Sequence, residues 1–254
     1  MKTKTGINPS KIGINPSTIG INPSKIGINP STIGINPSTI GINPSKIGIK
    51  VVLFDLGGVL IDFIGMRRIR ELMPVELPEE ELWRIWLTSR AVRRHDAGKS
   101  KLEEFVPEIV SELKLRISEE DFLKEFNAYK FSAYPGVENL LKELAESFTV
   151  ATLSNMNETY WVRIYSGMPV MKLFKHYFAS CRIGFVKPDK EAYQYAVDVL
   201  GCKPDEILFF DDNKLNVEGA KSAGLINSYR VFKVSGVREQ LEKLGLLGKM
   251  TEDR

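Results

Sequence analysis

The stretch KVVLFDLGGVLID, residues 50–62, joins a very apolar strand to a single acid. Its apolar part, Val51–Phe54, runs directly into the carboxylate of Asp55, and Gly57 and Gly58 follow. An acidic side chain at the end of such a strand is costly unless a cation or a chemical reaction keeps it there. Paired glycines let backbone N–H groups approach a ligand closely, and such arrays of donors suit anions. We therefore expect a functional carboxylate beside an anion-binding loop.

After Lys50 the sequence alternates between apolar runs and amphipathic helical patterns. The runs that we interpret as buried strands are Val51–Phe54, Thr149–Leu153, Tyr177–Ala179, Ile207–Phe210 and Ser228–Phe232. The helical patterns that alternate with them are Val137–Glu146, Asn157–Tyr165, Lys190–Leu200, Asn213–Ala223 and Val237–Leu244. This alternation predicts an α/β fold, with a parallel sheet covered by helices on both faces.

A long segment without a strand signal, residues 63–132, separates the first two strands. It offers four helical stretches, near Ile64–Met73, Glu79–Arg90, Leu102–Leu113 and Glu119–Phe131. Such an insertion predicts a helical cap, so the core comprises residues 50–62 and 133–254. Ligands of open α/β sheets bind beyond the carboxyl ends of the strands. The site is therefore expected where the strands end, beneath the cap.

Residues 1–49 differ from the rest in composition. Residues 6–47 are six copies of the unit GINPS(K/T)I, and the proline and glycine in every copy exclude a coiled coil. Three interpretations stay open: a mobile low-complexity tail, a small β-solenoid, or translated DNA repeats ahead of a working chain that begins near Lys50.

The charge of the chain is unevenly placed. Lysines and arginines outnumber acids by 35 to 32, which gives a formal net charge of +3. Residues 1–50 hold six lysines, no arginine and no acid, so subtracting six leaves −3 for the remainder. We therefore expect neither a nucleic-acid surface nor a membrane surface on the folded part.

Cys181 and Cys202 lie in neither a CxxC pair nor a repeated ladder, so we expect no disulfide framework and no zinc site. A reducing cytosol fits this usage. No apolar run approaches the roughly 18–20 residues that cross a bilayer, and the first residues show no secretory pattern. We expect a cytoplasmic protein without a membrane partner; its oligomeric state stays open.

Polar residues follow three other strands or their loops at the same edge of the expected sheet. TLSN offers Ser154 and Asn155, GFVKPD offers Lys187, and ILFFDDN offers Asp211 and Asp212. Taken singly, each is ordinary helix capping or a solvated lysine. Their joint occurrence at strand ends makes independent capping a poor explanation.

The combination predicts phosphoryl transfer. Asp55 and Asp211 are a hard oxygen pair that suits Mg²⁺. Lys187 and Ser154 suit the equatorial phosphate oxygens, where negative charge is spread in the transition state. Asp55 would attack phosphorus to give an aspartyl-phosphate, which water then hydrolyses.

The segments FDLGGVL, TLSN, VKPD and FFDDNKLNVEGAKSAG together resemble the four motifs of the haloacid dehalogenase superfamily of phosphohydrolases, over nearly all of residues 50–250. The resemblance implies a Rossmann-like core with an inserted α-helical cap, and Asp55 as the nucleophile. It implies catalytic and phosphate contacts from Ser154 and Lys187, and the further phosphate contacts are expected at Leu56, Gly57, Gly58 and Asn155. It also implies Mg²⁺ held by Asp55, the Gly57 carbonyl and Asp211, with Asp212 in support.

Within the superfamily the chain looks most like the bacterial α-D-glucose-1-phosphate phosphatases, on FDLG, LSN, FFDDN and the cap stretch HDAGKSKLEEF, residues 95–105. The expected activity is Mg²⁺-dependent hydrolysis of a small-molecule phosphomonoester, with a sugar phosphate as the leading substrate. Trp83 and Trp86 stand three residues apart, and we expect them to pack in the cap core rather than to hold a sugar.

Gly57 stands where most phosphatases of the superfamily carry a second Asp, which protonates the leaving oxygen and typically contributes roughly 10²–10⁴-fold. Three explanations stay open. His95 or Asp96 of the cap supplies the proton; a leaving group such as an anomeric oxygen needs little help; or the protein is a weak or inactive enzyme that keeps a phosphate-binding module. Haloacid dehalogenases also lack this Asp, but they need no Mg²⁺, and the double acid in FFDDN argues against that reaction.

Overall fold

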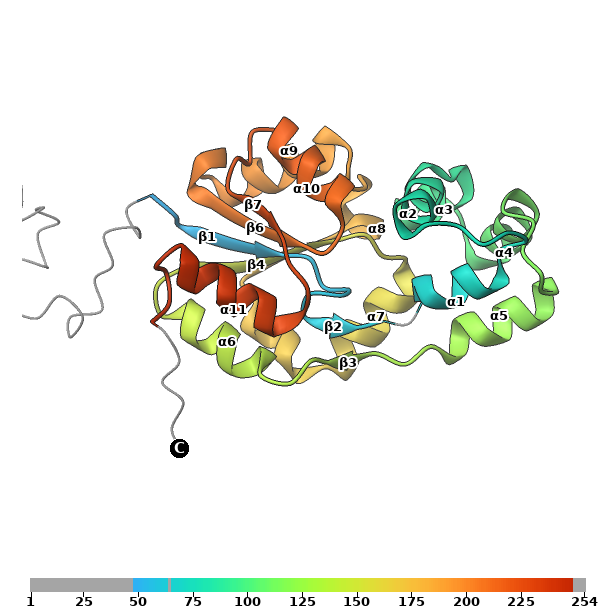
Figure 1. Cartoon of the computed structure of the whole chain (residues 1–254), viewed down its shortest axis with the longest axis horizontal. Helices are drawn as coiled ribbons and strands as arrows, with labels where there is room; N and C mark the ends of the chain where they lie inside the picture. Colours follow the sequence, from blue (N-terminus) through green and yellow to red (C-terminus); the bar gives the residue numbers. More distant parts are fainter. Residues whose placement is uncertain (1–47, 64, 249–254) are drawn as a thin grey trace, which may run out of the picture. The chain divides into compact units, whose positions relative to one another are not determined.

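The computed structural model describes residues 48–63 and 65–248 (Figure 1). The heptapeptide repeats of residues 6–47, with the three interpretations offered for them, lie outside the described residues. Within the described ranges, no helix has both the length and the apolar character needed to cross a bilayer.

Five parallel strands form the central sheet, in the order β5-β4-β1-β6-β7. They are β1 (Val51–Phe54), β4 (Thr149–Ser154), β5 (His176–Ala179), β6 (Ile207–Asp211) and β7 (Ser228–Arg230). All four residues of β1 are buried, as an apolar strand covered on both faces should be. Because β1 is the middle strand, Asp55 leaves the sheet at its centre.

Helices cover both faces of the sheet (Figure 1). Val52 and Phe54 of β1 pack into one apolar cluster together with α6 (Val137–Ala145), α7 (Glu158–Gly167) and α11 (Lys233–Lys243). Val51 and Leu53 pack into a second cluster with α9 (Lys190–Leu200) and α10 (Lys214–Ser222). Shorter elements are α8 (Ser180–Ile183) and the 3₁₀ helices Pro169–Leu173 and Pro204–Glu206. The predicted Rossmann-like α/β fold is confirmed.

The segment between β2 (Ile61–Asp62) and β3 (Ser132–Ala133) is helical and is called the cap. Its helices are α1 (Gly65–Leu72), α2 (Glu79–Thr88), α3 (Arg90–Asp96), α4 (Leu102–Glu112) and α5 (Glu119–Ala128). β2 and β3 pair antiparallel where the chain leaves and re-enters the core. The sequence did not reveal this ribbon, because two-residue strands show no periodicity.

One predicted cap helix is wrong in its extent. The chain does not continue as a single helix over Glu79–Arg90 but breaks at Ser89, and α3 begins there. The Ser89 Oγ accepts a hydrogen bond from the Val92 N–H at 3.2 Å. Serine is a favoured N-cap because it satisfies a backbone N–H that the first turn leaves unpaired. Because of this break, Asp96 is the last residue of a separate short helix, α3.

Candidate active site

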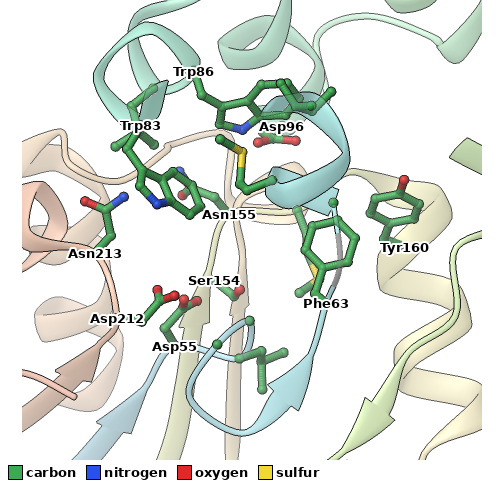
Figure 2. Close-up of a pocket in the computed structure, with 18 of the residues that line it drawn as sticks. Asp55, Phe63, Trp83, Trp86, Asp96, Ser154, Asn155, Tyr160, Asp212 and Asn213 are labelled. Carbon is green, nitrogen blue, oxygen red and sulfur yellow. The ribbon is translucent and has the colours of Figure 1, made fainter. Parts of the chain in front are cut away.

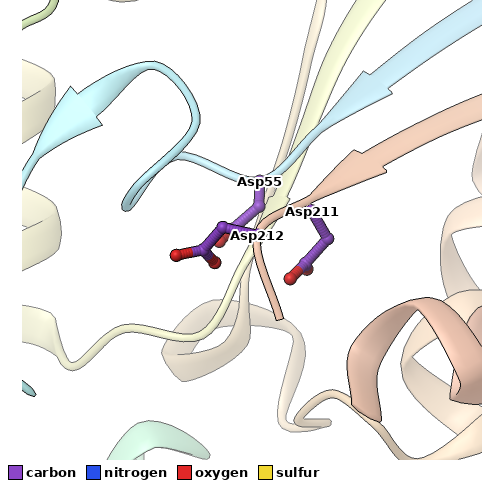
Figure 3. Close-up of side chains that lie close together, drawn as sticks. All are labelled: Asp55, Asp211 and Asp212. Atoms are coloured by element: carbon purple, nitrogen blue, oxygen red, sulfur yellow. The ribbon is translucent and has the colours of Figure 1, made fainter. Parts of the chain in front are cut away.

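Three carboxylates meet at the carboxyl ends of the two central strands β1 and β6 (Figure 3). Asp55 follows β1, Asp211 ends β6, and Asp212 comes next in the chain. One oxygen from each lies within 4.8 Å of the others. The two strands pair in register up to Phe54 and Phe210, so the residues that follow emerge side by side. The sheet thereby assembles an acidic cluster from two distant segments.

Lys187 is the buried cation of this cluster, with 1% of its surface exposed. Its Nζ lies 2.6 Å from Asp211 Oδ2 and 2.9 Å from Asp55 Oδ1. Burial alone would lower the pKa of Lys187, but the charges of Asp211 and Asp55 outweigh it and raise the pKa. The ammonium group therefore stays charged at neutral pH.

Asn155 fixes the backbone of Lys187. Its Nδ2 donates to the Lys187 carbonyl, and its Oδ1 accepts from the Lys187 N–H, both at 2.8 Å. Both polar atoms of the Asn155 amide are engaged by Lys187, and Asn155 also lines the cavity described below, so the phosphate contact expected of it stays a prediction. Ser154 lies beside Asp55 and faces the same cavity (Figure 2).

Asn213 and Asn216, which the sequence did not single out, hold Asp211. The Asn213 N–H donates to Oδ1 at 2.8 Å, and the Asn216 Nδ2 lies 3.1 Å from both carboxylate oxygens. Their place in DDNKLN, at the first turn of α10, is the signal that could have found them. Burial raises the pKa of Asp211 and of Asp212; the Asp55 charge adds to both shifts, and Lys187 opposes them.

The two glycines of the loop after β1 differ in their steric surroundings: a side chain cannot be accommodated at Gly58 but can be at Gly57. Gly58 has φ +72, and a Cβ there would lie 2.1 Å from Asp212 Oδ2. A Cβ at Gly57 would meet no atom within 4 Å. The absence of an acid at position 57 is therefore not forced by crowding.

The donor set at this edge fits a hard divalent cation. Three carboxylates against one ammonium leave an excess of negative charge, and this repulsion contributes to the raised pKa values of Asp211 and Asp212. Carboxylate and carbonyl oxygens are the ligands that Mg²⁺ takes in proteins. The cluster holds neither thiol nor imidazole, so the softer transition metals have no preferred ligand in it.

A cavity of about 360 Å³ extends from the acidic cluster to the cap (Figure 2). Its floor includes Asp55, Leu56, Gly57, Gly58, Ser154, Asn155, Lys187 and Asp212. Its roof is mostly aromatic and includes Phe63, Trp83, Trp86, Phe126, Tyr129 and Tyr160. Trp83 and Trp86 both line this cavity, and the expectation that they pack in the cap core rather than hold a sugar stays a prediction. Trp86 also packs against the apolar core, so helical spacing alone does not separate the two roles.

The two cap residues expected to supply a proton lie in different surroundings. His95 is buried, its ring stacks on Phe105 with centroids 4.3 Å apart, and Nδ1 lies 3.1 Å from the Ser100 carbonyl. Burial lowers the pKa of His95, so the ring is neutral at pH 7. The described lining of the cavity includes Asp96, beside Trp86 (Figure 2), and does not include His95. Burial raises the pKa of Asp96 to about 7.

The model of the haloacid dehalogenase-like hydrolases matches residues 49–224. The chain belongs to this family. Phosphatase MT3486 of Mycobacterium tuberculosis is 30% identical over 207 residues, which are 77% of this chain and 95% of the relative. (S)-2-haloacid dehalogenase 4A of Burkholderia cepacia is 31% identical over 107 residues, 41% of this chain and 46% of the relative.

Solved structures show the same fold. A predicted HAD-like family hydrolase from Porphyromonas gingivalis superposes with a TM-score of 0.60 at 20% identity, over 79% of this chain and 100% of that chain. This haloacid dehalogenase-like hydrolase therefore has relatives with phosphatase and with dehalogenase names, and its own reaction has to be argued from its site.

Proposed function

We propose that the protein is a Mg²⁺-dependent phosphatase that hydrolyses a small phosphomonoester through an aspartyl-phosphate on Asp55. The observation that supports this most is the set of three carboxylates, Asp55, Asp211 and Asp212, around the buried ammonium of Lys187. A dehalogenase needs a carboxylate nucleophile but no cation, and the excess negative charge here would then have no use. The cluster therefore favours the phosphatase over the dehalogenase.

In the proposed reaction the residues of the cavity floor have separate roles in attack and in charge stabilisation. Lys187 holds Asp55 Oδ1 at 2.9 Å, which orients the carboxylate for attack by Oδ2. The oxygen–phosphorus bond to Asp55 forms as the bond to the leaving oxygen breaks; water then displaces the carboxylate and releases inorganic phosphate. Lys187 and the Ser154 hydroxyl stabilise the phosphoryl oxygens. Mg²⁺ held by Asp55, Asp211, Asp212 and the Gly57 carbonyl would supply further positive charge beside them.

The leaving group departs without the acid that most superfamily phosphatases carry, because position 57 is a glycine. Asp96 lies beside Trp86 of the roof, across the cavity from Asp55 (Figure 2). Turnover should therefore depend steeply on how well the leaving oxygen departs unaided. A sugar phosphate remains the prediction from sequence, and the cavity lining combines aromatic rings with polar side chains such as Arg67, Glu79 and Asn157.

The test is steady-state hydrolysis of p-nitrophenyl phosphate, glucose 1-phosphate and glucose 6-phosphate, with Mg²⁺ and with chelator. Wild type is compared with Asp55→Asn and with Asp205→Asn, an exposed acid at the opposite edge of the sheet. We expect Mg²⁺-dependent turnover, fastest for the nitrophenyl ester, that Asp55→Asn abolishes and Asp205→Asn leaves intact.

Two other results would replace the proposal. Halide release from 2-chloropropionate without metal, in place of phosphate release, would make the protein a dehalogenase. Binding of Mg²⁺ and phosphate without any turnover would make it a phosphate-binding module.

A further inference from the structure

The two ends of the cavity differ in chemistry. The floor carries the acidic cluster, Lys187 and Ser154, whereas the roof is mostly aromatic, with Arg67, Arg70 and Glu79 of the cap also in the lining. Asp96 lies on this aromatic side, and Figure 2 shows its carboxylate beside the Trp86 indole. Glu79, a second acid from the cap in the lining, pairs with Arg70 at 3.5 Å. A substrate whose phosphoryl group rests on the floor therefore presents its other end to Trp86 and Asp96.

Contacts between cap and core fix the position of Asp96. It ends α3, and Arg93 of the same helix pairs with Asp189, two residues beyond Lys187. Gly98 follows with φ +69, packed so tightly on α8 that a Cβ would lie 2.5 Å from the Cys181 carbonyl. α3 is thus held against the core on both sides of Asp96, which stabilises one placement of its carboxylate above the floor.

Asp96 has no counter-charge. Among the described residues, its side chain makes neither a hydrogen bond nor an ion pair, and burial is the only cause of its raised pKa. Two of the three arginines of α3 are engaged elsewhere, Arg93 by Asp189 and Arg94 by two glutamates, and the third, Arg90, is exposed at the start of the helix. The Tyr160 hydroxyl donates to the Phe126 carbonyl at 3.3 Å. The Asp96 side chain is half-buried and faces the cavity, so a partner for its carboxylate can come from a molecule bound there.

Three kinds of substrate end can be compared at this place. An anionic end placed beside Asp96 would be repelled by it; Arg67 and Arg70, which also line the cavity, are exposed residues of α1, and Arg70 pairs with Glu79. A sugar beside Trp86 would place several hydroxyl groups against aromatic rings, where each needs a polar partner. An organic ammonium group needs only one counter-charge and is attracted by aromatic faces.

We propose that the cavity receives phosphomonoesters whose far end carries an organic ammonium group, which lies against Trp86 and pairs with the Asp96 carboxylate. This inference rests on the proposed phosphatase function and names its substrate class. It replaces the sugar phosphate expected from sequence, and it makes Asp96 a specificity-determining residue rather than the missing acid.

The test compares phosphocholine with its uncharged carbon isostere, in which a tert-butyl group replaces the trimethylammonium group. The two esters have the same shape, so the ratio of their kcat/KM values reports the charge. Wild type should prefer phosphocholine by roughly tenfold. Asp96→Asn should reduce the ratio most of the way to one. Glu103→Gln removes one exposed negative charge from α4 of the cap and should leave the ratio unchanged.

A wild-type ratio near one, or a ratio that Asp96→Asn does not alter, would overturn the inference. Turnover of p-nitrophenyl phosphate in the same preparation shows whether the phosphatase proposal itself holds. If that turnover is absent, calorimetric binding of the two esters to Asp55→Asn with Mg²⁺ decides the inference alone. Tighter binding of phosphocholine that depends on Asp96 supports it, and equal binding rejects it.

Discussion

Replacing Asp96 with asparagine should stabilise the protein, and more so at alkaline pH. Burial raises the pKa of Asp96 to about 7, against 3.8 for an ordinary Asp carboxyl. Between these two values the folded state keeps the proton that the unfolded chain has lost. The folded state then binds more protons, so rising pH favours unfolding, and the penalty is complete above about pH 7.

The size of this effect follows from the two pKa values. One pKa unit corresponds to about 1.4 kcal/mol, and integration from pH 5 to pH 8 gives a penalty that grows by about 2–3 kcal/mol. Asparagine has nearly the same shape and does not ionise. The stability that Asp96→Asn gains over wild type should therefore be larger at pH 8 than at pH 5 by that amount. For a domain of this size it corresponds to a difference of roughly 5–10 °C in Tm.

Urea unfolding at both pH values measures the difference directly. Wild type, Asp96→Asn and the surface control Glu103→Gln are compared, and the control should shift equally at the two pH values because its carboxyl is exposed. Comparison with wild type at each pH cancels the titration of other groups, including His95, to first order. The same gain for Asp96→Asn at pH 5 and pH 8 would refute the reasoning, since it would mean that water in the cavity keeps the carboxyl ionised.

Two further predictions concern the floor of the cavity. Gly57→Asp should raise kcat for alkyl phosphates by roughly 10²–10⁴-fold and change p-nitrophenyl phosphate hydrolysis little, because the space at position 57 is open; an equal gain for both ester types would contradict it. Lys187→Met should abolish turnover and destabilise the protein by about 3–5 kcal/mol, because Asp55 and Asp211 lose their buried cation. Urea unfolding without Mg²⁺ measures the loss, and a variant as stable as wild type would show that the two acids do not need the lysine.

The central strands and the residues that follow them could be predicted because a strand buried on both faces is apolar at every position, which is visible in the sequence. A strand such as Val51–Phe54 has no polar face, so a polar residue directly after it has to lie at the sheet's edge. Parallel pairing then brings the ends of neighbouring strands together, whatever their separation in sequence. The meeting of Asp55 and Asp211 follows from these two rules, whereas Lys187 comes from the loop between α8 and α9, which the rules do not place.

Side-chain direction inside the cap could not be predicted in the same way. His95 and Asp96 are adjacent in the chain, yet one stacks in the cap core and the other lines the cavity. Which of the two side chains faces the cavity depends on the residue at which α3 begins. That start is fixed by a local hydrogen bond at the N-cap, Ser89. Asn155 shows a related limit, because its residue type suits a phosphate contact and the clasp on Lys187 equally well.

The glycine at position 57 and the acid at position 96 are both compatible with a substrate that carries an ammonium group near its leaving oxygen. Without an acid at position 57, an alcohol departs more easily the lower its own pKa is. A positively charged nitrogen close to the leaving oxygen withdraws electron density and stabilises the departing alkoxide, which an uncharged alkyl chain or a distant hydroxyl group does not do. The carboxylate of Asp96, which lies beside Trp86 on the far side of the cavity from Asp55 (Figure 2), would select such substrates. By selecting ammonium-bearing substrates, Asp96 would favour esters whose leaving group departs with less need for an acid at position 57.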